Sequence, residues 1–321
     1  MNRLKVAVVG AGVMGRHHAN IYAVIPHVDL VALVDPDPAR REHAQKNYGL
    51  PTYAHLDELL LYEQIDAVSV ASPTSTHYAL TKQLLEANIH VLVEKPVATE
   101  ITQAKELMEM SRQRNLVLQV GHITRFYQAV QLLKRRVQNP YLIEARRLTP
   151  YARIKDVGVI LDLMIHDIDI VLGLVGSPIA NTSVAGHLLN GSPFEDVAAA
   201  QIVFENGCIA RFLASRVAPD AERTLVVAEA KQTLRLDFAK EPYTEIAVYQ
   251  PAKDDMGDSH MKVDVRTVHE DNPLKKELEH FLARIRNDAM PIGTLEDDLR
   301  SLTLATRLLE ELQLTRMAQL V

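Results

Sequence analysis

The stretch that decides the fold is Leu4-Lys-Val-Ala-Val-Val9, followed directly by Gly10-Ala-Gly-Val-Met-Gly15. An apolar run of strand length leads into the spacing Gly-x-Gly-x-x-Gly, and a helical pattern follows. Gly10 is expected to allow a tight turn, Gly12 to let the backbone approach a pyrophosphate, and Gly15 to permit close helix–strand packing. The N–H groups at the start of the helix would then face the phosphates. The predicted dinucleotide contacts of this turn are Gly10, Gly12, Val13, Met14 and Gly15.

Short apolar runs alternate with amphipathic segments through the first third of the chain. Patterns typical of amphipathic helices occur at 75–87 and 99–114. Strand alternating with helix indicates crossover connections and a doubly wound parallel sheet, because each helix must cover one face of the sheet. The predicted strands are 4–9, 30–34, 67–70, 90–93 and 116–120.

The pattern changes near Gly121. After a predicted helix at 159–172, strand-like runs follow one another from 182 to 249, which predicts a largely antiparallel sheet. We therefore predict an α/β protein with a doubly wound first domain, 1–121, and an α+β second domain, 122–321, built on a large, mostly antiparallel sheet. The predicted helices of this part are 124–138, 159–172, 273–286 and 295–318, the strands are 142–148, 182–189, 197–204, 208–215, 224–228, 232–237 and 245–249, and the polar loops are 149–157 and 250–262.

Composition narrows the possible functions. The length of 321 residues is sufficient for two domains, and the net charge of −6 argues against non-specific nucleic-acid binding, which needs a basic surface. No apolar run approaches the roughly 18 residues of a membrane span, and no secretory leader is recognisable, so we expect a cytoplasmic protein. The single cysteine, Cys208, cannot form an intrachain disulfide and is expected to fill a buried position.

Asp35 is the candidate for choosing the cofactor. It ends the second predicted strand, 20 residues after Gly15, where an acid binds the adenosine ribose 2′-hydroxyl. A carboxylate there repels a 2′-phosphate, so NAD is favoured over NADP. Arg40 and Arg41 weaken this argument slightly, because a nearby arginine can accept the phosphate; their simpler role is the solvated face of a helix.

A second polar turn, Ala71-Ser-Pro-Thr-Ser-Thr-His77, follows the strand 67–70. It lies at the carboxyl edge of the predicted sheet, where the cofactor crevice is expected. Ser75 or Thr74 would also make a good helix cap, and capping alone would explain the polar residues. The predicted cofactor contacts here are Ser72, Pro73, Thr74 and His77.

A lysine and an Asp/His pair are the candidates for chemistry. Lys95 lies in Glu94-Lys95-Pro96, just beyond the fourth predicted strand and at the same edge as the glycine turn. Asp162 and His166 are four residues apart in a predicted helix and so share one face. His166 suits a general base near neutral pH, and Asp162 can orient it or bind a hydroxyl. With a dinucleotide, these residues predict oxidation of an alcohol.

Plainer interpretations of the same residues stay open. Lys95 can be a surface charge, and the acids of 159–172, including Asp167 and Asp169, can form a solvated helix face or a metal site. Apolar neighbours favour burial of this helix, and buried acids need partners. One histidine without a cysteine is a poor zinc set, so no metal is predicted. His17 and His18 are expected at the surface or at a helix cap.

These motifs resemble those of the glucose–fructose oxidoreductase/inositol dehydrogenase/MocA family over essentially the whole chain. The resemblance implies an N-terminal Rossmann domain that binds NAD and a C-terminal open sheet that lines the substrate site and forms dimers or tetramers. It implies catalytic roles for Lys95, Asp162 and His166, and nicotinamide-side contacts from Glu94 and Lys95. Where many members have a run of glycines, this chain has 156–160 with Gly158 alone. The residues that carry the resemblance are Gly10–Gly15, Ser72-Pro73 with His77, Glu94-Lys95-Pro96, Gly121-His122 with Arg125-Phe126, and Gly158 through Asp162-Leu-Met-Ile-His166-Asp167-Ile-Asp169.

Within the family, residues 150–169 and 206–216 are similar to a branch that oxidises the C3 hydroxyl of UDP-N-acetylglucosamine. That resemblance implies a 3-keto product, which an aminotransferase converts to an amine for lipid A assembly. The substrate contacts that it favours are Lys95, His122, Arg125, Tyr151, Arg153, Asp162 and His166. A diphosphate needs cations, and the candidates, which can also be solvated strand and loop charges, are Arg146, Arg147, Arg153 and Arg216.

Two other functions stay open from the sequence. One is the same chemistry on a free polyol, inositol or aldose. The other is a non-enzymatic dinucleotide-binding regulator. Such proteins tend to lose the catalytic lysine or histidine, and this chain keeps both Lys95 and His166.

Overall fold

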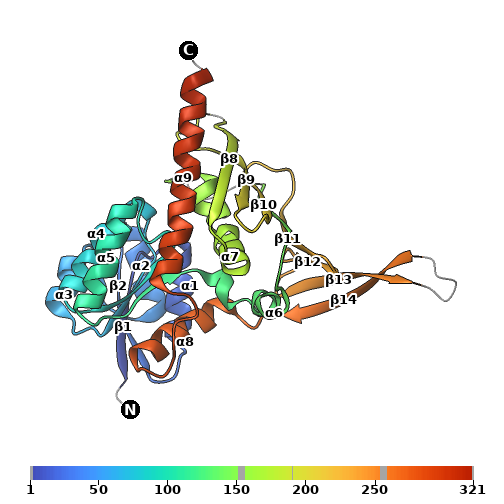
Figure 1. The fold of residues 1–321 in the computed structure, drawn as a ribbon. Coiled ribbons are helices and arrows are strands. Elements are labelled where there is room, and N and C mark those ends of the chain that lie inside the picture. The colour runs from blue at the N-terminus through green and yellow to red at the C-terminus, as the bar shows by residue number, and fades with distance from the viewer. Residues whose placement is uncertain (1–2, 151–155, 190, 254–258, 320–321) are drawn as a thin grey trace. The chain divides into compact units, whose positions relative to one another are not determined.

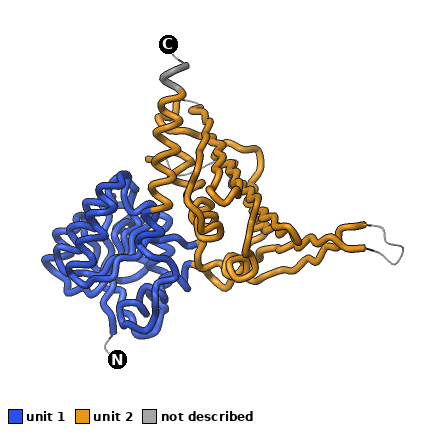
Figure 2. The backbone as a smooth tube through the Cα atoms, viewed as in Figure 1, with its two compact units in different colours: residues 1–123, 274–299 blue, residues 124–273, 300–321 orange. Residues whose placement is uncertain are grey.

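The computed structural model describes residues 3–150, 156–189, 191–253 and 259–319. The chain divides into two compact units, drawn in two colours in Figure 2. Unit 1 comprises residues 1–123 and 274–299, and unit 2 comprises residues 124–273 and 300–321.

Unit 1, whose strands β1 and β2 are labelled in Figure 1, contains a six-stranded parallel sheet of order β3-β2-β1-β4-β5-β6. The order reverses between β1 and β4, as in doubly wound sheets, so the predicted architecture is confirmed. A short strand and a short helix, β3 and α3, add to the predicted elements. The elements are β1 (Leu4–Val9), α1 (Val13–Tyr22), β2 (Val28–Val34), α2 (Pro38–Tyr48), β3 (Thr52–Tyr53), α3 (Leu56–Tyr62), β4 (Ala67–Val70), the 3₁₀ turn η1 (Thr74–Thr76), α4 (His77–Glu86), β5 (His90–Glu94), α5 (Ile101–Gln113) and β6 (Leu118–Gly121).

A later helix, α8 (Pro273–Ile285), completes the core of unit 1. Its apolar residues Leu274, Leu278 and Phe281 recur at helical spacing and join the same buried cluster as Val6 and Val8 of β1. The sequence predicts this helix but places it in the second domain. Burial of one apolar helix face against the parallel sheet explains why it belongs to unit 1.

Unit 2 is built on an eight-stranded sheet of order β14-β13-β12-β11-β7-β10-β9-β8. Its described pairs are antiparallel except for β7 with β10, which confirms the predicted mostly antiparallel sheet. The strands are β7 (Leu142–Leu148), β8 (Ile179–His187), β9 (Val197–Phe204), β10 (Ile209–Ser215), β11 (Glu222–Glu229), β12 (Gln232–Asp237), β13 (Tyr243–Lys253) and β14 (Ser259–His269). The helices are the 3₁₀ turn η2 (Ile123–Phe126), α6 (Gln128–Arg136), the π-helical turn η3 (Ile160–Met164), α7 (Ile165–Val175) and α9 (Leu295–Gln319), of which η2 and α9 begin in unit 1.

The polar segment 250–262, predicted to be a loop, is mostly strand. β13 continues to Lys253 and β14 begins at Ser259, with Met261 paired to Pro251 and Val263 to Tyr249. The polar composition hides a period-two alternation of apolar and charged residues, which is the signature of a strand. Residues 254–258 lie outside the described part of the chain.

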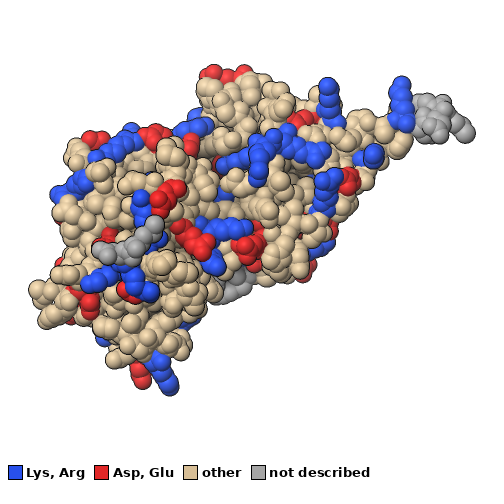
Figure 3. Space-filling view, turned by 90° about the horizontal axis from the view of Figure 1, so that it is seen from below, with Lys and Arg blue, Asp and Glu red and all other residues tan. Residues whose placement is uncertain are grey.

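One face of this second sheet is open. Along β7, Ile143, Ala145 and Arg147 are buried, whereas Glu144 and Arg146 on the opposite face are accessible. Basic and acidic side chains are also interspersed on the face of the molecule drawn in Figure 3. Among the described helices, none combines the length and apolar character needed to cross a membrane.

Candidate active site

The glycine turn between β1 and α1 has little room for side chains. A Cβ on Gly15 would lie 1.6 Å from the Gly10 carbonyl oxygen, and one on Gly10 would lie 2.5 Å from the Ala71 carbonyl oxygen. Gly10 also has a φ of +96°, which other residues rarely adopt. By contrast, the nearest atom to a Cβ on Gly12 is the Arg40 Nη1, at 3.8 Å. The backbone at Gly12 is therefore accessible, which fits the approach of a pyrophosphate to the start of α1.

The Asp35 carboxylate is buried directly behind this turn. Its two oxygens accept the N–H groups of Ala11 (2.8 Å) and Asp37 (2.9 Å). Arg40 is exposed on α2, as expected for a solvated helix face, and its Nη1 lies 3.5 Å from the Asp35 carboxylate; Arg41 donates to the Asp35 carbonyl oxygen. Each carboxylate oxygen accepts more than one hydrogen bond. Asp35 can therefore also accept a hydrogen bond from a ribose hydroxyl. The glycine turn and Asp35 together fit the binding of NAD.

The second polar turn is held by His77. One ring nitrogen lies 2.8 Å from the Pro96 carbonyl oxygen and the other 2.9 Å from the Ser72 carbonyl oxygen. The ring thus joins the turn after β4 to the turn after β5. A 3₁₀ turn precedes α4, so the residue at the N-cap position of that helix is Thr76 rather than Ser75 or Thr74, and the Thr76 hydroxyl bonds to Ser72. Direct cofactor contact from Ser72, Pro73, Thr74 and His77 stays a prediction.

Glu94 has a partner that the sequence did not indicate. His18, expected at the surface or at a cap, is fully buried on α1, and its Nε2 lies 3.0 Å from Glu94 Oε1. Burial raises the pKa of the Glu94 carboxyl, but the hydrogen bond and charge of His18 and the charge of Lys95 outweigh it, so the pKa is lowered. A Cβ on Gly121, opposite on β6, would lie 3.1 Å from the other Glu94 oxygen. The lack of a side chain on Gly121 and the partner His18 thus fix the carboxylate next to Lys95.

Lys95 itself is half-buried at the carboxyl end of β5, where a cis peptide joins it to Pro96. The ends of β1, β2 and β4 carry the glycine turn, Asp35 and the Ser72 turn. Parallel strands bring their carboxyl ends to one edge of the sheet. The predicted cofactor residues and Lys95 therefore share one edge of unit 1.

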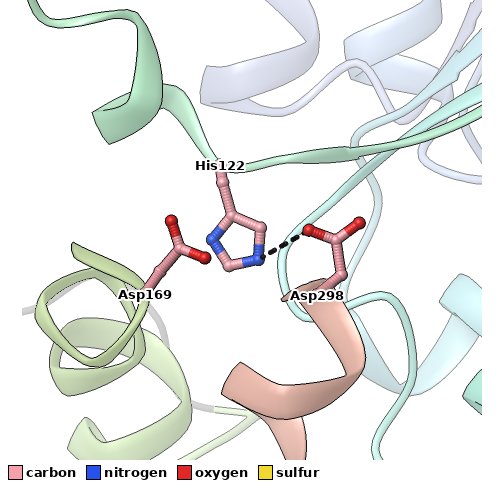
Figure 4. Close-up of side chains that lie close together, drawn as sticks. All are labelled: His122, Asp169 and Asp298. Carbon is pink, nitrogen blue, oxygen red and sulfur yellow. Dashed lines mark ion pairs between the residues drawn. The ribbon is translucent and has the colours of Figure 1, made fainter. Parts of the chain in front are cut away.

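His122 follows β6 in unit 1. Its buried ring points toward Asp298, in the first turn of α9, with Nε2 3.7 Å from the carboxylate (Figure 4). The role of His122 as a substrate contact stays a prediction.

Asp162 and His166 lie in unit 2 at the junction of η3 and α7. Asp162 is buried within the π-helical turn, whereas His166 and Leu163 are partly exposed. The i→i+5 bonding of a π turn differs from the α-helical spacing on which a shared face was predicted, and such turns are frequent at functional sites. The accessible imidazole is therefore the group of this helix best placed to meet a ligand.

The acids that flank His166 are buried and paired with arginines, so they do not form a solvated helix face. Asp167 accepts two hydrogen bonds from the Arg147 guanidinium, at 2.6 and 3.0 Å, and both side chains are buried. Asp169 accepts two from Arg125, at 2.5 and 2.9 Å, and a third from Ser301. The first pair joins α7 to β7, and the second joins it to η2 and α9. Arg125 was predicted to bind substrate, and that role stays a prediction. Within unit 2 its guanidinium is paired with Asp169.

The other candidate cations differ in their surroundings. Arg216 is buried and donates to Asp196 at 2.6 Å, so Arg147 and Arg216 are not solvated charges. Arg146 pairs with Glu222 on the open face, and its side chain is 48% exposed. Tyr151 and Arg153, predicted to bind substrate, lie outside the described residues.

Comparison with known proteins identifies the class. The model of the oxidoreductase family with an NAD-binding Rossmann fold matches residues 4–122, and that of the GFO/IDH/MocA C-terminal domain matches residues 130–235. The chain therefore belongs to the GFO/IDH/MocA family of oxidoreductases. Its cofactor is NAD, and its relatives are dehydrogenases of sugars and polyols.

Two relatives of known activity are similar to most of the chain. The chain is 34% identical to UDP-N-acetylglucosamine 3-dehydrogenase of Acidithiobacillus ferrooxidans over 240 residues, 74% of this chain and 75% of the relative. A solved structure of that enzyme superposes with a TM-score of 0.85 at 29% identity, covering 97% and 98% of the two chains. The chain is also 27% identical to scyllo-inositol 2-dehydrogenase (NAD(+)) of Bacillus subtilis, over 91% of this chain and 89% of the relative.

Proposed function

We propose that this protein oxidises the C3 hydroxyl of UDP-N-acetylglucosamine to the 3-keto sugar, with NAD⁺ as oxidant. The observation that carries the proposal is the similarity to UDP-N-acetylglucosamine 3-dehydrogenase, at 34% identity over three quarters of each chain. The same fold over nearly the whole length supports it. The chain keeps Lys95, Asp162 and His166, the residues to which the family resemblance gives the chemistry.

In the proposed reaction His166 takes the proton of the C3 hydroxyl, and Lys95 shares that proton through a hydrogen bond. Asp162 orients His166 or holds a neighbouring hydroxyl. Bound NAD⁺ supplies the hydride acceptor, so the products are the ketone, NADH and one proton. Glu94, fixed by His18, holds the segment that carries Lys95. We propose that unit 1 binds the cofactor and that unit 2 supplies the sugar site.

A substrate panel tests the proposal. The wild-type chain is incubated with NAD⁺ and UDP-N-acetylglucosamine, myo-inositol, scyllo-inositol or glucose, and NADH is measured. We expect turnover of the nucleotide sugar, and loss of that turnover in Lys95→Met and His166→Asn. Turnover of an inositol or glucose without turnover of the nucleotide sugar would establish the second candidate, a polyol or aldose dehydrogenase. The similarity to scyllo-inositol 2-dehydrogenase over 91% of the chain favours this alternative.

A 3-keto sugar is uphill from the alcohol with NAD⁺ near neutral pH, so a consuming reaction would draw the oxidation forward. We propose that an aminotransferase consumes the ketone, in the cytoplasm and as part of lipid A assembly. Adding such an aminotransferase and an amino donor should increase NADH formation from the nucleotide sugar. No increase would count against the pairing.

We also propose a homo-oligomer, a dimer or tetramer, assembled through the second sheet. Its open face and the exposed Met261, Val263 and Val265, which alternate along β14, leave apolar area for a second copy to cover. Light scattering should report more than one chain per particle, and Val263→Lys/Val265→Lys should reduce that number. A monomeric wild type would refute this assembly.

A further inference from the structure

The helix that carries Asp162 and His166 begins against a buried carboxylate, Glu195, from the segment before β9. Glu195 Oε1 accepts the N–H of Ile160 (2.9 Å), and its main-chain oxygen accepts the N–H of Val159 (3.1 Å). The first N–H groups of a helix have no partner within the helix. One residue from outside the helix thus satisfies two of them, and its carboxylate lies at the positive end of the helix dipole.

Gly158 makes this approach possible. A Cβ built on Gly158 would lie 2.0 Å from one carboxylate oxygen of Glu195 and 2.1 Å from its carboxyl carbon. The carboxylate therefore occupies the volume that any other residue type would fill at this position. Gly158 is also the one glycine that the chain keeps where many family members have several.

The neighbouring residues hold this arrangement in place. Arg216 donates to the Asp196 carboxylate (2.6 Å) and to the Val157 carbonyl oxygen (2.9 Å), and all of these groups are buried. Burial raises the pKa of the Glu195 carboxyl, against the opposing effects of the Ile160 N–H and the Arg216 charge. The backbone on both sides of Gly158 is therefore tied to the segment that contains Glu195 and Asp196.

We infer that Glu195 is a positioning residue: through Val159 and Ile160 it sets the orientation of the turn from which Asp162 and His166 project. The inference rests on the proposed function only in assigning the proton transfer to His166. Loss of the Glu195 side chain should lower kcat. It should leave KM for NAD⁺ unchanged, because the cofactor determinants lie in unit 1. Misplacement of a reacting group by about 1 Å can cost on the order of 100-fold in rate.

The test compares kcat, KM for NAD⁺ and Tm in Glu195→Ala, Glu195→Gln and the control Glu205→Ala, which removes an exposed glutamate just after β9. Glu195→Ala should lower kcat about 10- to 100-fold at unchanged KM for NAD⁺. Glu195→Gln should keep most of the wild-type kcat, because the amide oxygen still accepts the Ile160 N–H. Gly158→Ala alone should also lower kcat, but it should cause no further loss in Glu195→Ala, where the colliding carboxylate is gone.

Several results would overturn the inference. One is an equal kcat in Glu195→Ala and Glu205→Ala. A second is a kcat in the Gly158→Ala/Glu195→Ala double variant that falls by the product of the two single losses. A third is a kcat in Glu195→Gln as low as that in Glu195→Ala. If the wild type does not oxidise the nucleotide sugar, the proposed function fails and the variants are compared on the alcohol that is oxidised. The His166 imidazole resonance, assigned with His166→Asn, gives a substrate-free comparison; an unchanged resonance in Glu195→Ala would overturn the inference by itself.

Discussion

The Arg147–Asp167 pair predicts an asymmetric loss of stability. Both side chains are less than 10% exposed and form two hydrogen bonds, so removing one partner leaves a buried charge, at a typical cost of about 3–5 kcal/mol. Arg223 on β11 determines which removal costs more, because its charge attracts Asp167 and repels Arg147. Burial and the charge of Arg147 lower the pKa of Arg223. Arg147→Met leaves Asp167 near this second cation, whereas Asp167→Asn leaves the buried Arg147 without its carboxylate and beside the partly buried Arg223. We expect about 3 kcal/mol for Arg147→Met and more for Asp167→Asn.

Urea unfolding followed by circular dichroism is the assay, because the chain has no tryptophan. The adjacent residue supplies the control: Arg146 is on the open face, and Arg146→Met should change the free energy of unfolding by less than about 1 kcal/mol. Arg147→Met/Asp167→Leu, which removes both charges, should recover part of the loss. Equal costs for Arg146→Met and Arg147→Met, or a larger cost for Arg147→Met than for Asp167→Asn, would refute the reasoning.

Three further predictions concern unit 1. Asp35→Ala removes the acceptor of two main-chain N–H groups and should raise KM for NAD⁺ about 10-fold or more; an unchanged KM in steady-state kinetics would contradict the assignment. His18→Phe should lower the free energy of unfolding by about 1–3 kcal/mol, His18→Gln by less because it keeps a donor to Glu94, and the exposed control His17→Phe hardly at all. Because folding lowers the pKa of Glu94, its contribution to stability is complete above the ordinary value of 4.5 and is lost as pH falls below it. Glu94→Gln should therefore flatten the acid limb of Tm against pH, and an unchanged limb would argue against the pairing.

The position of the glycine turn and of Asp35 at one edge of the sheet could be predicted because the signals are local. The glycine spacing directly follows a strand, and Asp35 ends the next strand, so each residue is placed by its own neighbours in sequence. His18 shows the limit of such reasoning. Nothing near it distinguishes it from the exposed His17, and its buried environment depends on Glu94, 76 residues further along. A buried polar side chain is explained by its partner, and sequence spacing does not supply that partner.

The same limit explains the charges around His166. Asp167 and Asp169 are compatible with a solvated face until Arg147 and Arg125, 20 and 44 residues away, are known to bond to them. Apolar contacts are non-directional, so an almost wholly apolar helix could rotate or slip against the sheet at little cost. A bidentate guanidinium–carboxylate pair has a fixed geometry and is satisfied in one orientation of the helix. The two buried pairs, and Glu195 at the helix start, therefore determine which face of the helix is accessible. On this reasoning the position of the imidazole in unit 2 depends more on these polar contacts than on the apolar residues that bury the helix.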